Sequence, residues 1–206
     1  MSGVTVKVTA LGGPALQQRL GFLVSRLDDP TALWKVVGRR GANELKSHFR
    51  KRNRVPNRLG GKRTNYWRRI ADSVQNPEIE PRAVTITIGD PTFGQKLFGG
   101  RITAKNAKNL SLPVDPLAHG RTVAVFKQET GIELFFFRPK ARGLGKYLAG
   151  KNEDGSSGIR VFYRLTPFVD QKPDPEALPK DAVFDAALLD ETEKYVARLE
   201  RDTRGN

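Results

Sequence analysis

The chain has 206 residues, of which 38% are hydrophobic, so it can build one domain of which parts are extended or become ordered only on a partner. Its 36 Lys and Arg against 22 Asp and Glu give a formal net charge of +14, which predicts an anionic partner, either nucleic acid or an acidic protein surface. The absence of cysteine excludes disulfides and thiolate chemistry, and no apolar run approaches the roughly 20 residues that span a bilayer.

The N-terminal part predicts a strand followed by helices. Valines alternate with polar residues over Val4–Thr9, a pattern typical of a half-buried strand, and leucines recur at helical spacing over Leu16–Leu27. Asp28-Asp29-Pro30 favours a helix start, because Asp can cap a first turn and Pro is tolerated there, and the helix should run to about Phe49. The first residues lack a basic segment ahead of a long apolar run, so we expect no signal peptide and a cytoplasmic origin.

The chain becomes strongly basic between Arg39 and Arg69. This window holds twelve Lys and Arg and the single acid Glu44, so +11 of the net charge lies within 31 residues. Its centre contains Pro56 and a glycine pair but few apolar anchors, which indicates an exposed loop at about residues 50–63 between two helices. The residues predicted to contact a partner are Arg50, Lys51, Arg52, Arg54, Arg58, Lys62 and Arg63.

Three aromatic residues, Phe49, Tyr66 and Trp67, interleave with this basic segment. Arginines on phosphates and rings stacked on bases would make the chain a sequence-independent nucleic-acid-binding protein. Contact with an acidic neighbouring subunit explains the same residues equally well, and a soluble basic protein without a nucleic-acid role is a third reading. No helix-turn-helix, zinc or RNP pattern indicates sequence-specific recognition.

The second half of the chain predicts mainly antiparallel strands. We expect a hairpin of Thr122–Phe126 with Ile132–Phe137, and pairing of Ile132–Phe137 with Arg160–Leu165 around a long tip at Arg138–Gly158. The other predicted elements are a short helix at Tyr66–Val74, a strand at Ala83–Ile88, a proline-rich connector and a final helix at Asp181–Arg201.

This order of elements predicts an α+β protein, with one antiparallel sheet, helices packed on one face of it, long loops and a C-terminal helix. We expect residues 1–206 to form a single domain whose extended loops lie at about 50–63 and 138–158 and whose C-terminal helix covers about 181–201.

No arrangement of residues predicts catalysis, a cofactor or a metal. His48 lies on the apolar stripe of a helix, where it packs or caps, and His119 lies in a turn, where we expect it to be solvated. No cluster of His and acids has metal-ligand spacing. The steps at Gly60-Gly61-Lys62 and Gly143–Lys146 lack residues that a phosphate loop requires. We therefore expect no enzymatic activity.

The stretch Leu97–Val114 predicts a shaped loop without chemistry of its own. Gly99 and Gly100 allow the backbone to turn where a Cβ would clash, and a short strand-like step follows. Lys105 and Lys108 should face solvent or a neighbour. The alternation of Leu110 and Leu112 before a proline predicts a return strand at the edge of a sheet.

Residues of this stretch carry a resemblance to a known family. Phe98-Gly99-Gly100-Arg101-Ile102, followed by Lys105-Asn106-Ala107-Lys108 and Leu110-x-Leu112-Pro113, resembles the signature of the phage virion morphogenesis (tail completion) family of Mu-like tailed phages. The order of an upstream helix, a basic Arg/Pro/Gly segment and a strand before the signature is also similar. The resemblance covers roughly Trp34–Phe137.

The resemblance implies a structural virion protein of the phage neck or upper tail, which completes the tail or joins it to the head. Such proteins form rings, commonly hexameric, so the expected partners are copies of this chain, neighbouring neck or tail-tube proteins and DNA in the channel, with no membrane. Assembly would take place in the host cytoplasm. The residues of the expected assembly loop are Phe98, Gly99, Gly100, Ile102, Lys105, Lys108, Leu110, Leu112 and Pro113.

Overall fold

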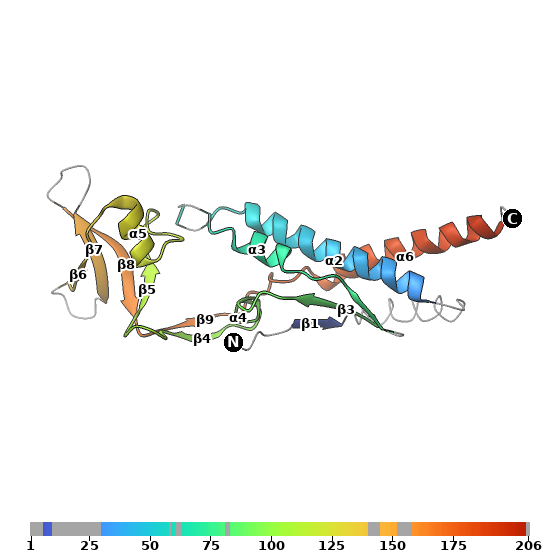
Figure 1. Ribbon diagram of the computed structural model, residues 1–206, viewed down its shortest axis with the longest axis horizontal. Helices are drawn as coiled ribbons and strands as arrows, with labels where there is room; N and C mark the ends of the chain where they lie inside the picture. The colour runs from blue at the N-terminus through green and yellow to red at the C-terminus, as the bar shows by residue number, and fades with distance from the viewer. Residues whose placement is uncertain are drawn as a thin grey trace. The chain divides into compact units, whose positions relative to one another are not determined.

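The computed structural model describes residues 6–9, 30–57, 59–60, 63–80, 83–139, 145–151 and 158–204 (Figure 1). The predicted helix over Leu16–Leu27, two residues of the basic segment (Arg58 and Lys62) and parts of the predicted tip lie outside these residues. Where the sequence predicts one domain, the chain divides into two compact units: residues 1–54, 66–99 and 173–206 form the first, and residues 55–65 and 100–172 form the second.

The first unit packs helices against an antiparallel sheet. Its strands β1 (Val6–Thr9), β3 (Ala83–Ile88) and β2 (Glu78–Glu80) pair in the order β1-β3-β2, with Val6 opposite Ile88 and Ile79 opposite Val84. Its helices are α2 (Thr31–Arg54), α3 (Tyr66–Asp72), α4 (Phe93–Phe98) and α6 (Asp181–Arg204). The helix start at Pro30 is confirmed, since the Pro30 carbonyl accepts the N–H of Trp34 at 3.0 Å.

The core of the first unit follows helical spacing. Leu33, Val37, Leu45 and Phe49 form a buried stripe on α2 that packs with the buried residues of β3 and with Phe184 and Leu188 of α6. Gly38 lets α2 approach the sheet closely, because a Cβ at this position would lie 2.7 Å from Val84 Cγ1.

Helix α2 continues to Arg54, five residues beyond the predicted end at Phe49, so residues 50–54 are helical rather than part of a loop. Lys and Arg are good helix formers, and no apolar residue is needed to extend a helix whose preceding turns are already anchored. Tertiary contacts hold the extension, as Asn53 Oδ1 accepts the backbone N–H of Arg68 on α3. The prediction placed the helix end where the apolar stripe stops, which is too early.

The second unit contains two sheets. Strands β4 (Gly100–Thr103) and β9 (Phe168–Gln171) form an antiparallel pair. Strands β5 (Leu110–Pro113), β8 (Ile159–Thr166), β7 (Lys146–Lys151) and β6 (Phe135–Phe137) form a four-stranded antiparallel sheet in the order β5-β8-β7-β6. The α+β class is confirmed, but the described strands are divided among three sheets instead of one.

Two strand predictions in this unit are wrong. Residues Thr122–Phe126 begin helix α5 (Val123–Thr130) and form no hairpin with Ile132–Phe137. Thr122 caps the helix by accepting the Val125 N–H at 3.3 Å, and Gly131 ends it in the left-handed conformation with φ of 69°. These two caps outweigh the strand preference of Val-Ala-Val-Phe, and Phe126 becomes buried beside Phe162 and Tyr163.

Strand β7 is the second correction. It lies inside the predicted tip at Arg138–Gly158 and separates β6 from β8, which therefore do not pair. The segment has few large apolar residues, so its periodicity is weak. Gly150 is buried in this strand, and a Cβ there would lie 2.6 Å from Ile132 Cγ2, which shows how closely β7 packs. No helix among the described residues is long and apolar enough to cross a membrane.

Candidate functional site

The glycine pair after α4 has the backbone that the sequence predicts. Gly99 follows the helix with φ of 70° and ψ of −157° and donates its N–H to the Gln95 carbonyl at 3.0 Å. Gly100 has φ of 120°. Side chains with a Cβ rarely adopt such angles, so the turn requires glycine at both positions. The chain passes here from the first unit to the second.

Strand β4 leaves this turn as one half of a narrow ribbon. Its partner β9 is the only described strand that it pairs with, and one of the two inner pairs is charged, Arg101 opposite Asp170. The Arg101 guanidinium donates to both Asp170 oxygens at 2.7 and 3.1 Å and lies 4.1 Å from the centre of the Phe168 ring. Both charged side chains are more than half exposed, so this pair contributes little stability.

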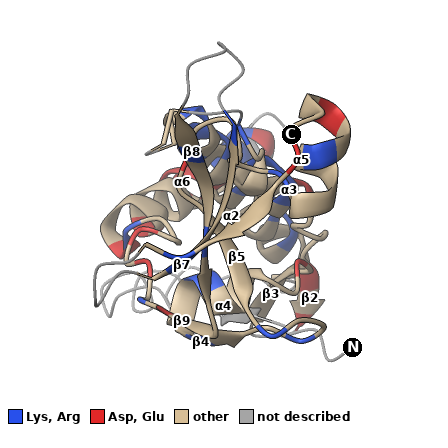
Figure 2. Ribbon diagram, turned by 90° about the vertical axis from the view of Figure 1, so that its left-hand side faces the viewer, with Lys and Arg blue, Asp and Glu red and all other residues tan. Residues whose placement is uncertain are grey.

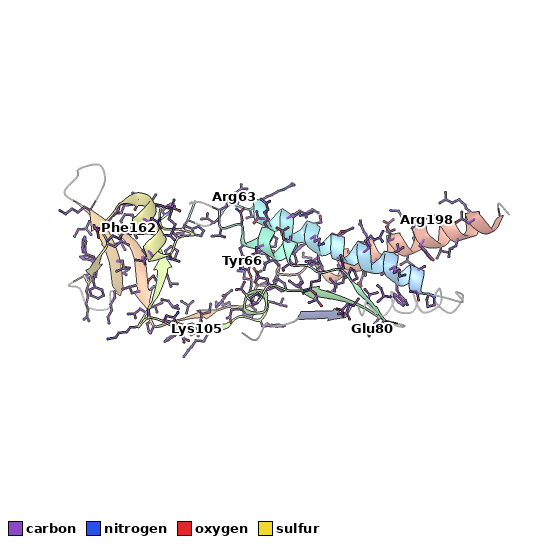
Figure 3. All side chains as sticks on the ribbon, in the orientation of Figure 1. Arg63, Tyr66, Glu80, Lys105, Phe162 and Arg198 are labelled. Atoms are coloured by element: carbon purple, nitrogen blue, oxygen red, sulfur yellow. The ribbon has the colours of Figure 1, made fainter. Side chains whose placement is uncertain are left out.

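A six-residue loop interrupts the pairing beyond Thr103. Thr103 lies opposite Phe168, and Leu110 lies opposite Thr166, so residues 104–109 face Pro167 alone. The chain must therefore bulge outward, and residues 105–108, which include Lys105 and Lys108, are all exposed (Figure 3). We call residues 104–109 the ribbon loop. The expectation that the two lysines face solvent or a neighbour agrees with this exposure.

The return strand β5 lies at the edge of the four-stranded sheet, as its proline predicts. Leu110 and Leu112 are half-buried on one face of this strand, and Pro113 ends its pairing opposite Tyr163. At the other end of the stretch Phe98 is 66% exposed, whereas Ile102 is half-buried. The structure thus brings the predicted assembly residues into one helix end, two strands and the ribbon loop.

The basic segment is mostly helical, and its residues divide by role. Arg50, Lys51 and Arg54 are exposed on α2, and Arg63 is exposed in the second unit. Arg52 differs, because its guanidinium donates to the two Asp174 oxygens at 3.2 and 3.0 Å and lies 4.1 Å from the Trp67 ring. Arg52 is therefore a structural residue that holds the segment before α6 against α2.

Asp174 receives more than one cation. Lys96 lies 3.3 Å from the same carboxylate, and the Glu176 backbone N–H donates to it at 3.1 Å. Burial opposes the charged form, but the hydrogen bonds from Arg52, Glu176 and Lys96 outweigh burial and lower the pKa of Asp174. His48 contacts the same segment through its Nε2 and the Glu176 carbonyl at 3.0 Å, which agrees with its predicted structural role.

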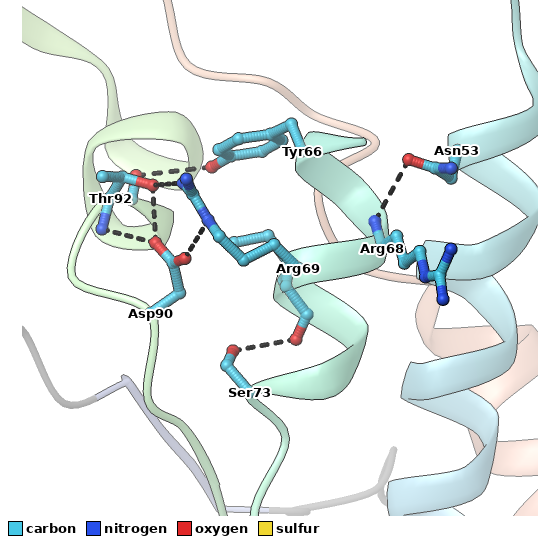
Figure 4. Close-up of polar contacts among 8 residues, drawn as sticks. Asn53, Tyr66, Arg68, Arg69, Ser73, Asp90 and Thr92 are labelled. Carbon is cyan, nitrogen blue, oxygen red and sulfur yellow. Dashed lines mark hydrogen bonds and ion pairs between the residues drawn. The ribbon is translucent and has the colours of Figure 1, made fainter. Parts of the chain in front are cut away.

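A second carboxylate organises the turn ahead of α4, and sequence reasoning did not find it (Figure 4). Asp90 is buried and accepts bonds from the Thr92 N–H at 2.8 Å and from Arg69 Nε at 2.7 Å. Burial raises the pKa of Asp90, but these bonds together with that of the Thr92 hydroxyl lower it overall. The Asp-Pro-Thr sequence was the only signal, since an Asp often accepts from the N–H two residues later.

The predicted role in base stacking is wrong for Phe49, whereas Tyr66 and Trp67 are half-buried. Phe49 is fully buried and stacks on Trp67 with ring centres 5.9 Å apart, and Tyr66 packs against the same core. Trp67 is further covered by Arg52. Phe49 is therefore not free to stack on a base, and the core covers Tyr66 and Trp67 in part.

The described residues contain no group of three or more His, Cys, Asp and Glu side chains that could hold a metal ion. His119 lies in a turn as predicted, but it is half-buried rather than fully solvated. Comparison of the chain with models of protein families, with curated proteins and with solved structures finds no match. The ribbon and the exposed cations of α2 are the features of the described residues that bear on function.

Proposed function

We propose that the chain is a structural virion protein of the neck or upper tail of a tailed phage, where it completes the tail or joins it to the head as a ring subunit. The observation that carries this proposal is the ribbon: Gly99 and Gly100 start it, β4 and β9 form it, and the ribbon loop protrudes from it. Gly99, Gly100, β4 and the ribbon loop belong to the stretch that resembles the tail-completion signature.

The ribbon is suited to be completed by another chain. A two-stranded antiparallel pair is marginally stable by itself in water, and among the described strands β4 and β9 have only each other. Their outer edges present N–H and C=O groups that a strand or loop of a neighbour can pair with. Repetition of such a contact from one copy to the next closes into a ring when the rotation between copies closes.

The proposal assigns partners to these surfaces. Copies of this chain, in a ring that the family resemblance makes hexameric, would meet along the ribbon edges, and the ribbon loop would contact a neighbouring neck or tail-tube protein. The protein would be assembled in the host cytoplasm and remain in the virion.

The experiment is complementation of a phage that lacks this protein. Lys105→Glu with Lys108→Glu changes only exposed side chains, so the variant should fold normally yet fail to join finished tails to heads, as counted by electron microscopy. Lys146→Glu with Lys151→Glu, two exposed lysines outside the ribbon, is the matched control and should support normal particles. Normal particles from the ribbon-loop variant, or a wild-type protein that is absent from purified virions, would refute the proposal.

A further inference from the structure

One face of helix α2 in the first unit carries several cations that form no ion pair with the described residues. Lys35, Arg39, Lys46, Arg50 and Arg54 recur on α2 at spacings of four or seven residues, so they lie within about 100° of arc around the helix axis. This arc is opposite the buried stripe of Leu33, Val37, Leu45 and Phe49. None of the five side chains makes a hydrogen bond or ion pair with another described residue. We call these five residues the α2 basic face (Figure 2 colours Lys and Arg blue).

The composition of this face distinguishes it from a protein interface. Within α2, which the structure describes in full, every exposed residue from Arg39 onward is Lys or Arg except Asn43. Protein–protein interfaces have an apolar or aromatic centre from which Lys is depleted. Ala32 and the half-buried Val36 are the apolar residues on the same arc, and a face that is otherwise cationic or polar instead matches a polyanion whose charges are regularly spaced.

The face also contains shallow hollows lined by cations, which can receive phosphate groups. Asn43, Lys46, Ser47, Arg50, Lys51 and Arg54 line a shallow hollow of about 280 Å³. A second hollow of about 220 Å³ is lined by Asn43, by Val36, Arg39 and Arg40 of the same helix, and by Glu191 and Arg198 of α6. Glu191 lies in this second hollow but is paired with Arg198 at 3.6 Å, and Glu44 is paired with Arg40 at 3.6 Å. The nearby acids are thus neutralised by cations outside the basic face.

We propose that the α2 basic face binds the phosphate backbone of duplex DNA without reading its sequence. The face is about 28 Å long at 1.5 Å per residue, a length that spans several phosphates of one duplex turn. Phe49 is buried and Tyr66 and Trp67 are half-buried against the core, which leaves little ring surface for the base stacking that single-strand binding uses and favours a duplex over a single strand. This inference does not depend on the ribbon, and its residues are different.

The test is fluorescence anisotropy of the full chain with a labelled duplex of about 20 base pairs, in two unrelated sequences, between about 50 and 200 mM KCl. Five phosphate contacts predict a slope of about −4.5 for log K against log salt, a loss of about 500-fold over this range. The variant Lys46→Gln, Arg50→Gln, Arg54→Gln should reduce the slope to about −2. Glutamine keeps the helix, which circular dichroism checks.

A control variant that loses the same number of charges distinguishes the effect of this face from the effect of the net charge of the protein. Lys146→Gln, Lys151→Gln, Lys172→Gln removes three exposed positive charges elsewhere and should leave the slope within about one unit of wild type. The proposal is overturned if wild type does not bind at the lowest salt, if the control lowers the slope as much as the helix variant does, or if one duplex sequence is strongly preferred. Binding of polyglutamate but not of DNA would also overturn it and would indicate an acidic protein partner.

Discussion

Gly99 offers the sharpest test of the turn from which the ribbon starts. Its φ of 70° with ψ of −157° lies in a region that essentially only glycine occupies, whereas Gly131, with φ of 69° and ψ of −1°, is in the left-handed helical region. Asparagine tolerates the second region but not the first. Gly99→Asn should therefore lower the free energy of unfolding by about 2 kcal/mol, and Gly131→Asn by less than about 1 kcal/mol.

Urea unfolding followed by circular dichroism measures both values in the full chain. Gly131 is a matched control, since it also follows a helix at nearly the same φ and a Cβ there meets no atom within 4 Å. Any cost at Gly131 thus comes from the backbone alone. If Gly99→Asn destabilises the protein no more than Gly131→Asn does, the backbone at residue 99 does not require the conformation that only glycine adopts readily. That result would refute the assignment of Gly99 as the fixed start of the ribbon.

Three further outcomes follow from the first unit. Gly38→Ala should destabilise it by about 1 kcal/mol or more in urea, because overpacking against Val84 exceeds the gain in helix propensity; greater stability would contradict the close approach of α2. Arg52→Lys should cost about 1 kcal/mol, since Lys cannot donate to both Asp174 oxygens; an unchanged urea midpoint would refute the anchoring role. The lowered pKa values of Asp90 and Asp174 mean that the folded state favours their ionised forms, so this stability is present above the ordinary carboxyl pKa and is lost as the pH falls through the folded-state values. The melting temperature should therefore fall between about pH 5 and pH 3, and a double Asp→Asn variant with the same steepness would contradict this.

The concentration of positive charge in the basic segment was read correctly from the sequence, but the structure places the exposed cations on a helix face and not in a loop. The sequence predicted a partner-binding loop at residues 50–63, with arginines and aromatic rings acting together. In the structure Arg52 and Trp67 contact each other and belong to the fold, while Arg50 and Arg54 join Lys35, Arg39 and Lys46 on one helix face. Helical spacing within the segment could have indicated this face, had the helix been extended past Phe49.

The sequence by itself determined those features that depend on residues close together in the chain. Positive φ at Gly99 and Gly100, the strand Ala83–Ile88, the edge position of Pro113 and the last helix each depend on residues within a few positions of one another. A glycine pair, an alternating strand and a proline restrict the backbone wherever they occur, so these features need no knowledge of distant contacts.

Tertiary structure alone decided which residues pack and which remain free. Arg52 meets Asp174, which is 122 positions away in the chain, and no local pattern contains that pair. Strand β7 forms because β6 and β8 flank it, and the burial of Phe126 beside Phe162 and Tyr163 adds to the local caps that make α5 a helix. Among the described residues no acid pairs with the cations of the α2 basic face, because a helix charge forms an ion pair only where the fold brings an acid within reach.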